Sequence, residues 1–249
     1  MFTKVKTLTE QQNMRESGRI LAEILKKIKA NVQPGMNGKD ISRLADVELK
    51  AYRAKPSFLG YGGYPDVICI SVNDVVVHGI PNGAPFKNGD IISFDFGVNY
   101  KGMITDSAFS MVLGKATKTQ QRLLKATERS MYAGIEQLKD GVRVGDIGAA
   151  VQKILDAERL GIVRDLVGHG VGHYVHEDPN IPNYGVSGTG PTLKAGMTIA
   201  IEPMATLGGD AVTMDRDGWT IRTADGSLAA HFEHTILITQ DGYEILTAW

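Results

Sequence analysis

Cysteine is almost absent from this sequence, which contains Cys69 alone among its 249 residues. With one cysteine, no disulfide can form within the chain, and a zinc site built from several cysteine thiolates is excluded. Such low cysteine usage favours a reducing compartment.

Long apolar runs and a large net charge are lacking as well. No run approaches the ~20 apolar residues that a membrane helix needs, and the N-terminal segment MFTKVKTLTEQQ has no apolar stretch typical of a signal peptide. The formal net charge is −1, which gives no reason to expect nucleic acid or a membrane surface as partner. We therefore expect a cytoplasmic protein without membrane or direct nucleic-acid contacts.

The chain alternates between helical and strand-like stretches, twice in the same order. Apolar residues at helical spacing indicate helices, and short Val-, Ile- and Phe-rich stretches cut by Gly, Pro and Asn indicate strands. Thr9 is expected to cap the first helix. The predicted order is a helix over about 9–30, a helix over 39–54, strands within 67–113, helices over about 118–139 and 146–159, and strands in the remainder.

Two pairs of motifs match between the halves of this pattern. PGMNGKDIS (34–42) shares its first glycine and its Asp-Ile pair with DGVRVGDIG (140–148). FKNGDIISFDF (86–96) matches LKAGMTIAIEP (193–203) through a Lys-x-Gly turn and a following apolar strand. Coincidence between such turns is the alternative, but two matches in the same order favour an internal duplication.

The second pair of motifs places two acidic residues at equivalent positions. Asp95 and Glu202 follow the glycines of their motifs at the same interval, near the ends of equivalent strands. We expect an α+β fold with pseudo-two-fold symmetry, in which pseudo-repeats of about 9–115 and 116–245 form one domain over 1–249. Both acids would then surround one central site.

A predicted hairpin brings two acids together. In residues 93–109, a two-residue loop of Tyr100 and Lys101 would place Asp95 directly opposite Asp106. Opposed β-carbons lie about 4.5–5.5 Å apart, where like charges are destabilising, and the apolar flanks add a burial cost. No Lys or Arg nearby in sequence can neutralise both acids. This favours a divalent cation over the alternative, a solvent-exposed hairpin with two idle acids.

The second half supplies further candidate ligands. The segment GHGVGHYVHEDP (168–179) contains three histidines and is too rich in glycine for a stable helix; we expect His173 not to be a ligand. Glu202 ends one apolar strand and Glu233 begins another, where an unpaired buried carboxylate would be costly. Because successive strand residues point to opposite faces, only one of Glu233 and His234 can face the site, and we choose Glu233.

The resulting inventory is four carboxylates and one imidazole. One divalent ion cannot balance four negative charges, whereas two ions can. Two metal ions about 3.5–4 Å apart form a recurring hydrolytic device. Oxygen-rich ligation with a single histidine favours Mn²⁺, Fe²⁺, Co²⁺ or Zn²⁺ over copper.

An ordered set of motifs resembles the methionine aminopeptidases, most closely their short, bacterial-type (type I) form. The set spans nearly the whole chain and is far more specific than any single motif. The motifs are HGIP (78–81), DFG (95–97), TDS (105–107), GHGVG (168–172), VHEDP (175–179), IEPM (201–204) and FEHT (232–235).

This resemblance implies the pita-bread fold and a two-metal hydrolase that removes the initiator methionine when the second residue is small. It implies that Asp106 and Glu233 bridge the two metal ions. Its full ligand set is Asp95, Asp106, His169, Glu202 and Glu233.

The resemblance also implies catalytic and substrate-binding roles. Glu202 would accept a proton and pass it to the leaving amine, His176 would stabilise the tetrahedral intermediate, and His78 would hold the scissile amide. The family often has histidine where Gly62 stands, and His173 is unusual for the glycine-rich motif. Residues at the family's pocket positions, each of which could equally belong to the core, are Tyr61, Tyr64, Cys69, Val175 and Trp219.

The expected partners are the N-termini of nascent polypeptides. A transient ribosome contact is compatible with such substrates, although no basic patch argues for it, and we expect a monomer. Two alternatives stay open: a proline-directed relative (prolidase or aminopeptidase P) with the same five ligands, and a non-catalytic pita-bread binding module.

Overall fold

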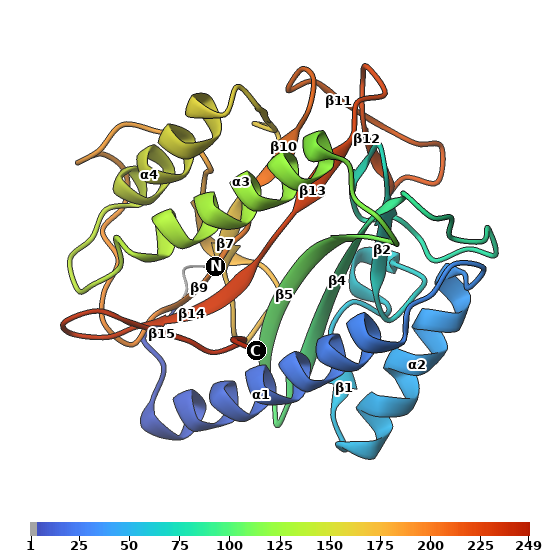
Figure 1. The fold of residues 1–249 in the computed structure, drawn as a ribbon. Coiled ribbons are helices and arrows are strands. Elements are labelled where there is room, and N and C mark those ends of the chain that lie inside the picture. Colours follow the sequence, from blue (N-terminus) through green and yellow to red (C-terminus); the bar gives the residue numbers. More distant parts are fainter. Residues whose placement is uncertain (1–3) are drawn as a thin grey trace.

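The computed structural model describes residues 4–249, so the first three residues of the N-terminal segment discussed above lie outside the described residues. Helix pairs followed by strands occur twice along the chain, in the predicted order (Figure 1). The helices are α1 (Leu8–Asn31), α2 (Gly38–Ala51), the 3₁₀ helix η1 (Tyr61–Gly63), α3 (Lys118–Ile135) and α4 (Val144–Ala157).

The strands are short except for the hairpin of β4 and β5. They are β1 (Lys55–Pro56), β2 (Cys69–Val72), β3 (Val75–Val77), β4 (Ile91–Tyr100), β5 (Met103–Val112), β6 (Gly161–Ile162), β7 (Gly168–Gly170), β8 (Glu177–Ile181), β9 (Thr198–Ile201), β10 (Met204–Thr206), β11 (Val212–Met214), β12 (Ile221–Thr223), β13 (Ala229–His231), β14 (His234–Ile238) and β15 (Tyr243–Ile245).

Helix α1 begins earlier than predicted because Thr7, and not Thr9, is its N-cap. The Thr7 hydroxyl accepts a hydrogen bond from the Glu10 backbone N–H, and the Glu10 carboxylate accepts one from the Thr7 N–H. This reciprocal capping box satisfies donors that the first helical turn leaves unpaired. Helix α3 ends at Ile135, short of the predicted end at 139, because the chain there tightens into a turn with a hydrogen bond from Leu138 N to Ile135 O.

Each half is organised around one central strand. Strand β4 pairs antiparallel with β2 and β5 in the first half, and β9 pairs antiparallel with β7 and β14 in the second. Strands β1, β8 and β15 extend these two sheets, and two further sheets have the orders β13-β10-β6 and β11-β12-β3.

The internal duplication appears in the hydrogen bonds. Gly35 N donates to Phe86 O at 2.9 Å, and the equivalent Gly141 N donates to Leu193 O, also at 2.9 Å. In both halves the motif before the second helix is thus bonded to the motif before the central strand. The matched motifs are therefore equivalent in this hydrogen bond as well as in sequence.

Strand β5 of the first half is joined to the second half by direct backbone contacts. Glu233 N donates to Ala108 O at 2.9 Å, and Ala108 N donates to Glu233 O at 3.2 Å. The Thr235 hydroxyl accepts from Asp106 N at 2.8 Å. Two candidate ligands, Asp106 and Glu233, are consequently held side by side on segments far apart in sequence.

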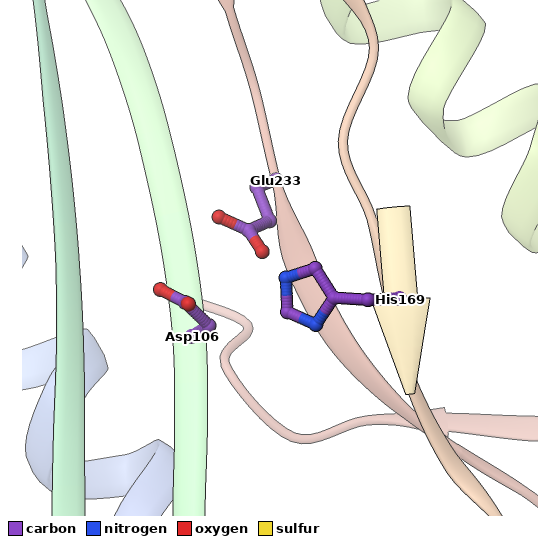
Figure 2. A group of neighbouring side chains, drawn as sticks. All are labelled: Asp106, His169 and Glu233. Carbon is purple, nitrogen blue, oxygen red and sulfur yellow. The ribbon is translucent and has the colours of Figure 1, made fainter. Parts of the chain in front are cut away.

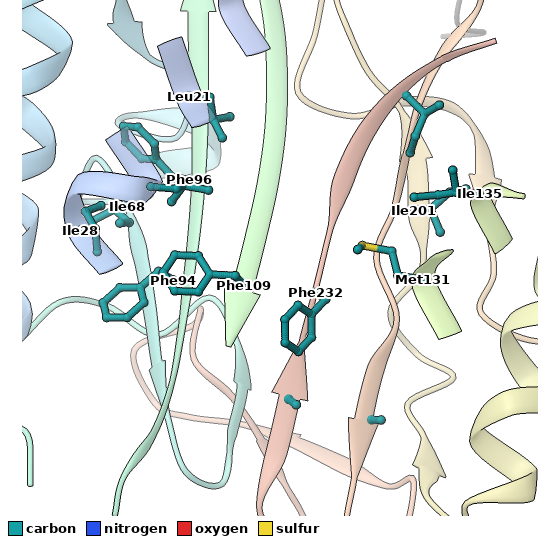
Figure 3. Close-up of a cluster of buried hydrophobic side chains, with 14 of the residues drawn as sticks. Leu21, Ile28, Ile68, Phe94, Phe96, Phe109, Met131, Ile135, Ile201 and Phe232 are labelled. Carbon is teal, nitrogen blue, oxygen red and sulfur yellow. The ribbon is translucent and has the colours of Figure 1, made fainter. Parts of the chain in front are cut away.

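The main apolar core lies between the helices and the strands. Figure 3 shows Leu21 of α1 and Phe94 and Phe96 of β4 in one part of it, and Ile135 of α3 and Ile201 of β9 in the other; all are buried in one cluster. Helix α1 packs against β4 and β5 (Figure 1). Because successive strand residues face opposite sides, packing Phe94 and Phe96 toward the helices turns the intervening residue, Asp95, to the other face. Among the described residues, no helix combines the length and the apolarity that crossing a bilayer requires.

The register of the β4–β5 hairpin differs from the prediction. Its loop consists of Lys101 and Gly102, so Asp95 pairs with Ala108 while Asp106 pairs with Gly97. Both loop residues have positive φ, 50° and 83°, as a type I′ turn requires, and glycine adopts this conformation without steric cost. The two acids are therefore diagonal neighbours on one face, not directly opposed, and Asp95 lies in the middle of β4, not near its end.

This turn generates a stability prediction. Replacing Lys101 by Asn should raise the free energy of unfolding by about 0.5 kcal/mol, because asparagine tolerates positive φ better than lysine. Gly102→Val should lower it by about 1–3 kcal/mol because a β-branched residue is strained at positive φ. Urea unfolding measures both changes, with Lys115→Asn as a charge-matched control. A destabilised Lys101→Asn variant would contradict this account of the turn.

Candidate metal centre

The five predicted ligands converge on one pocket. Asp95 comes from β4, Asp106 from β5, His169 from β7, Glu202 from the residue after β9, and Glu233 from the residue before β14. Figure 2 shows the side chains of Asp106, His169 and Glu233 pointing toward one another from three different elements, and their donor atoms lie within 4.8 Å of one another. Both halves of the chain therefore contribute to a single site.

The imidazole of His169 is oriented for ligation. Its Nδ1 lies 3.0 Å from the backbone carbonyl of Gly170, which can only accept a hydrogen bond, so Nδ1 carries the proton and the lone pair is on Nε2. Nε2 lies 3.3 Å from a carboxylate oxygen of Glu202, close to the spacing of two ligand atoms that each lie ~2.0–2.2 Å from one ion. Burial lowers the pKa of His169 to about 3, so the ring is neutral.

The carboxylates lack the partners that buried charges normally have. In the described part of the chain, one oxygen each of Asp95, Asp106 and Glu233 is buried without a hydrogen-bond partner. No lysine or arginine is found among the described residues that line the pocket. Buried anions without partners are costly, and a set of carboxylate oxygens with one imidazole nitrogen suits divalent metal ions. The residues present therefore fit metal binding.

Titration of these groups reflects the same shortage of positive charge. Burial raises the pKa of Asp95 well above its ordinary value, and the neighbouring carboxylates of Asp106 and Glu202 raise it further. Burial is also the main cause that raises the pKa of Asp106 to about 8, with the Glu202 carboxylate adding to it. The pKa of Glu233 is raised by burial and then by the other acids of the cluster. A divalent cation would reverse these shifts because it stabilises the ionised forms.

One further side chain of the centre, His231, was not among the predicted ligands. It is buried, its Nε2 lies 3.4 Å from a Glu202 oxygen, and neither ring nitrogen has a hydrogen-bond partner in the described residues. With Glu202 and Glu233 it forms a second group of potential metal donors. Its spacing could have revealed it, since residues two apart in an extended segment share a face.

An apolar pocket adjoins the carboxylates. All the residues predicted from the family's pocket positions line it, and Phe58, which was not predicted, lines it as well. Tyr64 packs edge-on against Trp219, with 5.1 Å between the ring centroids, and its hydroxyl donates to backbone carbonyls of residues 68 and 79. Burial raises the pKa of the Cys69 thiol, which keeps it neutral. The predicted pocket residues are Tyr61, Tyr64, Cys69, Val175 and Trp219.

Two neutral histidines, His78 and His176, line the same pocket as the carboxylates. Burial lowers the pKa values of His78, to about 4, and of His176. Nδ1 of His176 lies 2.8 Å from the Tyr61 hydroxyl, and its ring meets that of His169 with centroids 4.2 Å apart. His78 has a positive φ of 57°, a strained conformation that occurs preferentially at functional sites.

The structure separates the remaining candidates from the pocket. His173 bonds to Glu10 at 2.8 Å instead of facing the carboxylates. His234 points away from the pocket, where its Nδ1 lies 2.8 Å from the Thr247 hydroxyl, so Glu233 is the residue of this pair that lines the site. At Gly62, which has a φ of 53°, a β-carbon would lie 3.1 Å from the Trp219 ring; the glycine allows this close approach.

Comparison with known proteins agrees with this arrangement. The family description Peptidase_M24, "Metallopeptidase family M24", matches residues 12–240. Methionine aminopeptidase 1 of Bacillus subtilis is 45% identical over 242 residues, which cover 97% of this chain and 98% of that protein. The methionine aminopeptidase of Escherichia coli is 40% identical over 249 residues, or 99% of this chain and 94% of that protein.

Solved structures give the same result. The methionine aminopeptidase from Thermotoga maritima superimposes with a TM-score of 0.97 at 42% identity and covers 100% of both chains. The prolidase from Pyrococcus furiosus has a TM-score of 0.80 at 21% identity and covers 98% of this chain but 65% of that one, a likeness of fold alone. The shared architecture is the pita-bread fold. With a family match over most of its length and near-full-length relatives at 40–45% identity, the chain belongs to metallopeptidase family M24.

Proposed function

We propose that this protein is a metal-dependent aminopeptidase that removes the N-terminal methionine from polypeptides whose second residue is small. The observation that carries the proposal is the convergence of Asp95, Asp106, His169, Glu202 and Glu233 beside an apolar pocket. The near-full-length similarity to methionine aminopeptidases supports it.

The centre is proposed to hold two divalent ions, of cobalt, manganese, iron or zinc. Four carboxylates need two such ions for charge balance, and Asp106 and Glu233, whose backbones are held side by side, would be among the residues that hold them. When bound, a pair of divalent ions supplies Lewis acidity at the scissile carbonyl and makes water nucleophilic near neutral pH.

The chain's own residues then handle protons and developing charge. Glu202 is the proposed proton carrier between the attacking water and the leaving amine. The Tyr61 hydroxyl can donate to Nδ1 of His176, which leaves the ring proton on Nε2 as a donor for the tetrahedral intermediate. His78 lines the same pocket and is proposed to hold the scissile amide.

Specificity is proposed to come from the shape of the apolar pocket. Phe58, Tyr64, Cys69 and Val175 form a buried apolar cluster against which Trp219 packs. Such a wall suits a long, unbranched thioether side chain, which can adapt to an irregular surface. Crowding beside His78 would select a small second residue.

We further propose that the whole chain acts as one catalytic domain, as a monomer in the cytoplasm, on the N-termini of nascent polypeptides. The origin of the ligands in both halves supports the single domain, because neither half carries a complete site. Cys69, the one cysteine of the sequence, is a free thiol, as expected in a reducing compartment. A transient contact with the ribosome would bring the site to its substrates.

A metal-titrated peptide assay tests the activity. The metal-free protein should gain hydrolysis of Met-Gly-Met on addition of Mn²⁺ or Co²⁺. It should cleave Xaa-Pro peptides at least ~100-fold less, which corresponds to about 2.8 kcal/mol of discrimination at 1.4 kcal/mol per factor of ten. Asp95→Ala and Glu233→Ala should abolish turnover, whereas exposed Asp165→Ala should not. A preference for Xaa-Pro peptides would indicate the proline-directed alternative. Retention of metal without any peptide hydrolysis would indicate the non-catalytic binding module.

The cluster of acids predicts that Asp106→Asn changes the stability of the protein in opposite directions with and without bound metal. The folded pKa of Asp106 is raised from 3.8 to about 8, so the folded protein binds more protons than the unfolded chain between these values. Stability of the metal-free protein should therefore fall as pH rises from about 4 to about 8. Asp106→Asn should reduce this loss and raise the melting temperature at pH 8 by about 2–4 °C per kcal/mol recovered.

In metal-loaded protein the same variant should be the less stable one, because it loses a ligand. Calorimetric unfolding with a chelator and with Mn²⁺ measures the stability change of Asp106→Asn in each state. Titration calorimetry measures the number of ions bound. Two ions per chain are expected in the parent. A parent protein whose metal-free stability increases over this pH interval would refute the electrostatic argument.

The proposed donor role of His176 can be tested against that of Tyr61. His176→Ala should lower kcat by about 10²–10³, the usual loss for one oxyanion donor. Tyr61→Phe should have the smaller effect of about tenfold or less, because it removes only the group that orients the ring. Steady-state kinetics on Met-Gly-Met measure both, with exposed Tyr174→Phe as control. An unchanged kcat in His176→Ala would exclude the donor role.

A further inference from the structure

The segment before α1 inserts a lysine into the interior of the protein. The side chain of Lys6 is 0% exposed, and its Nζ lies 3.0 Å from a carboxylate oxygen of Glu177, whose side chain is 3% exposed. The two residues are separated by 171 positions in sequence. Lys6 N also donates to Gly196 O at 2.7 Å, which anchors the segment's backbone beside the second sheet.

Glu177 connects this lysine to the loop that carries His176. One of its carboxylate oxygens pairs with Lys6, and the other accepts hydrogen bonds from the backbone N–H groups of His173, at 2.7 Å, and Tyr174, at 3.2 Å. The carboxylate thus closes the loop of residues 172–177 on itself. His176 directly precedes Glu177 in the chain, so its backbone is joined to the residue that this carboxylate anchors.

The loop is also shaped to receive the lysine stem. A β-carbon on Gly172 would lie 2.4 Å from Cε of Lys6, so the lysine fills the space that the glycine leaves. The outer side of the loop is held by a hydrogen bond between Nε2 of His173 and the Glu10 carboxylate at 2.8 Å. The start of the chain therefore contacts the loop at two separate points.

We propose that Lys6 is a positioning residue for the active site: through Glu177 it fixes the loop of residues 172–177 and thereby the placement of His176 in the pocket. The proposal rests on the proposed function, in which His176 stabilises the intermediate. A buried ion pair is a weak source of net stability because desolvation offsets its attraction. The Lys6–Glu177 pair instead fixes geometry, because the Glu177 carboxylate binds both the N-terminal segment and the loop of residues 172–177.

Kinetic coupling to His176 provides the first test. Lys6→Met should lower kcat on Met-Gly-Met by about 10–100-fold, as typical for the loss of an orienting partner, with KM changed less than about twofold and the same number of ions bound. In a His176→Ala background the same substitution should cost less than about twofold, because residues that act through one group are not additive. Lys4→Met, on the exposed neighbouring lysine, is the matched control. Equal losses in both backgrounds, or loss of bound metal, would overturn the proposal.

A second measurement does not depend on turnover. The ring protons of His176 can be assigned by comparing NMR spectra of histidine-labelled parent and His176→Ala proteins. In Lys6→Met these resonances should shift or broaden, while Lys4→Met should leave them unchanged. Should Lys6→Met fold poorly, Lys6→Met combined with Glu177→Gln removes both charges of the buried ion pair and should fold yet show the same displaced His176 signal. Unperturbed His176 resonances refute the positioning role even if the parent hydrolyses methionyl peptides; a parent without hydrolysis but with the expected shifts refutes the proposed function alone.

Discussion

Repulsion among buried carboxylates is the constraint on which the rest of the site depends. Asp95, Asp106 and Glu233 are buried, each with an oxygen that no described group satisfies. A fold cannot hold such a cluster for stability's sake, since each uncompensated buried charge costs several kcal/mol. The backbone nevertheless holds the cluster tightly, through direct hydrogen bonds between Ala108 and Glu233 across the two halves. The scaffold supplies the rigidity, and the cations must supply the missing charge.

The face of the β4–β5 hairpin that carries Asp95 and Asp106 could be predicted even though the pairing of its strands was predicted wrongly. Placing the loop at Tyr100 and Lys101 instead of Lys101 and Gly102 moved the partner of Asp95 by two residues, from Ala108 to Asp106. A shift of two preserves which face a side chain occupies, whereas a shift of one would have reversed it. The prediction that the acids converge was therefore right although the predicted turn was wrong, because convergence depends on the alternation of side chains along each strand and not on the exact partner. The repeat of helices and strands was predictable for a similar reason, since it rests on periodicity and on glycine motifs.

Residues that act through tertiary packing were harder to predict. Phe58 lines the pocket just before η1, and nothing in its local sequence distinguishes it from a core aromatic residue. The pairing of Lys6 with Glu177 joins positions 171 residues apart, a distance over which one sequence carries no pairing signal. His231 is the exception, because its position two residues before Glu233 already placed it on the ligand face.

The histidines of the site complete the electrostatic argument. Protonated imidazoles could in principle neutralise the acids, but burial lowers the pKa values of His169 and His231 to about 3 and that of His78 to about 4. These rings are neutral throughout the physiological range, so they supply no positive charge that would stabilise the ionised carboxylates. Neutrality is also what the proposed roles would require, since a ligand offers a lone pair and a hydrogen-bond donor offers an N–H, each at a defined nitrogen. The same desolvation that disfavours the ionised carboxylates thus keeps the imidazoles neutral. A bound divalent cation would stabilise the ionised carboxylates and would accept the lone pair of a neutral imidazole, so both effects of burial would favour metal binding.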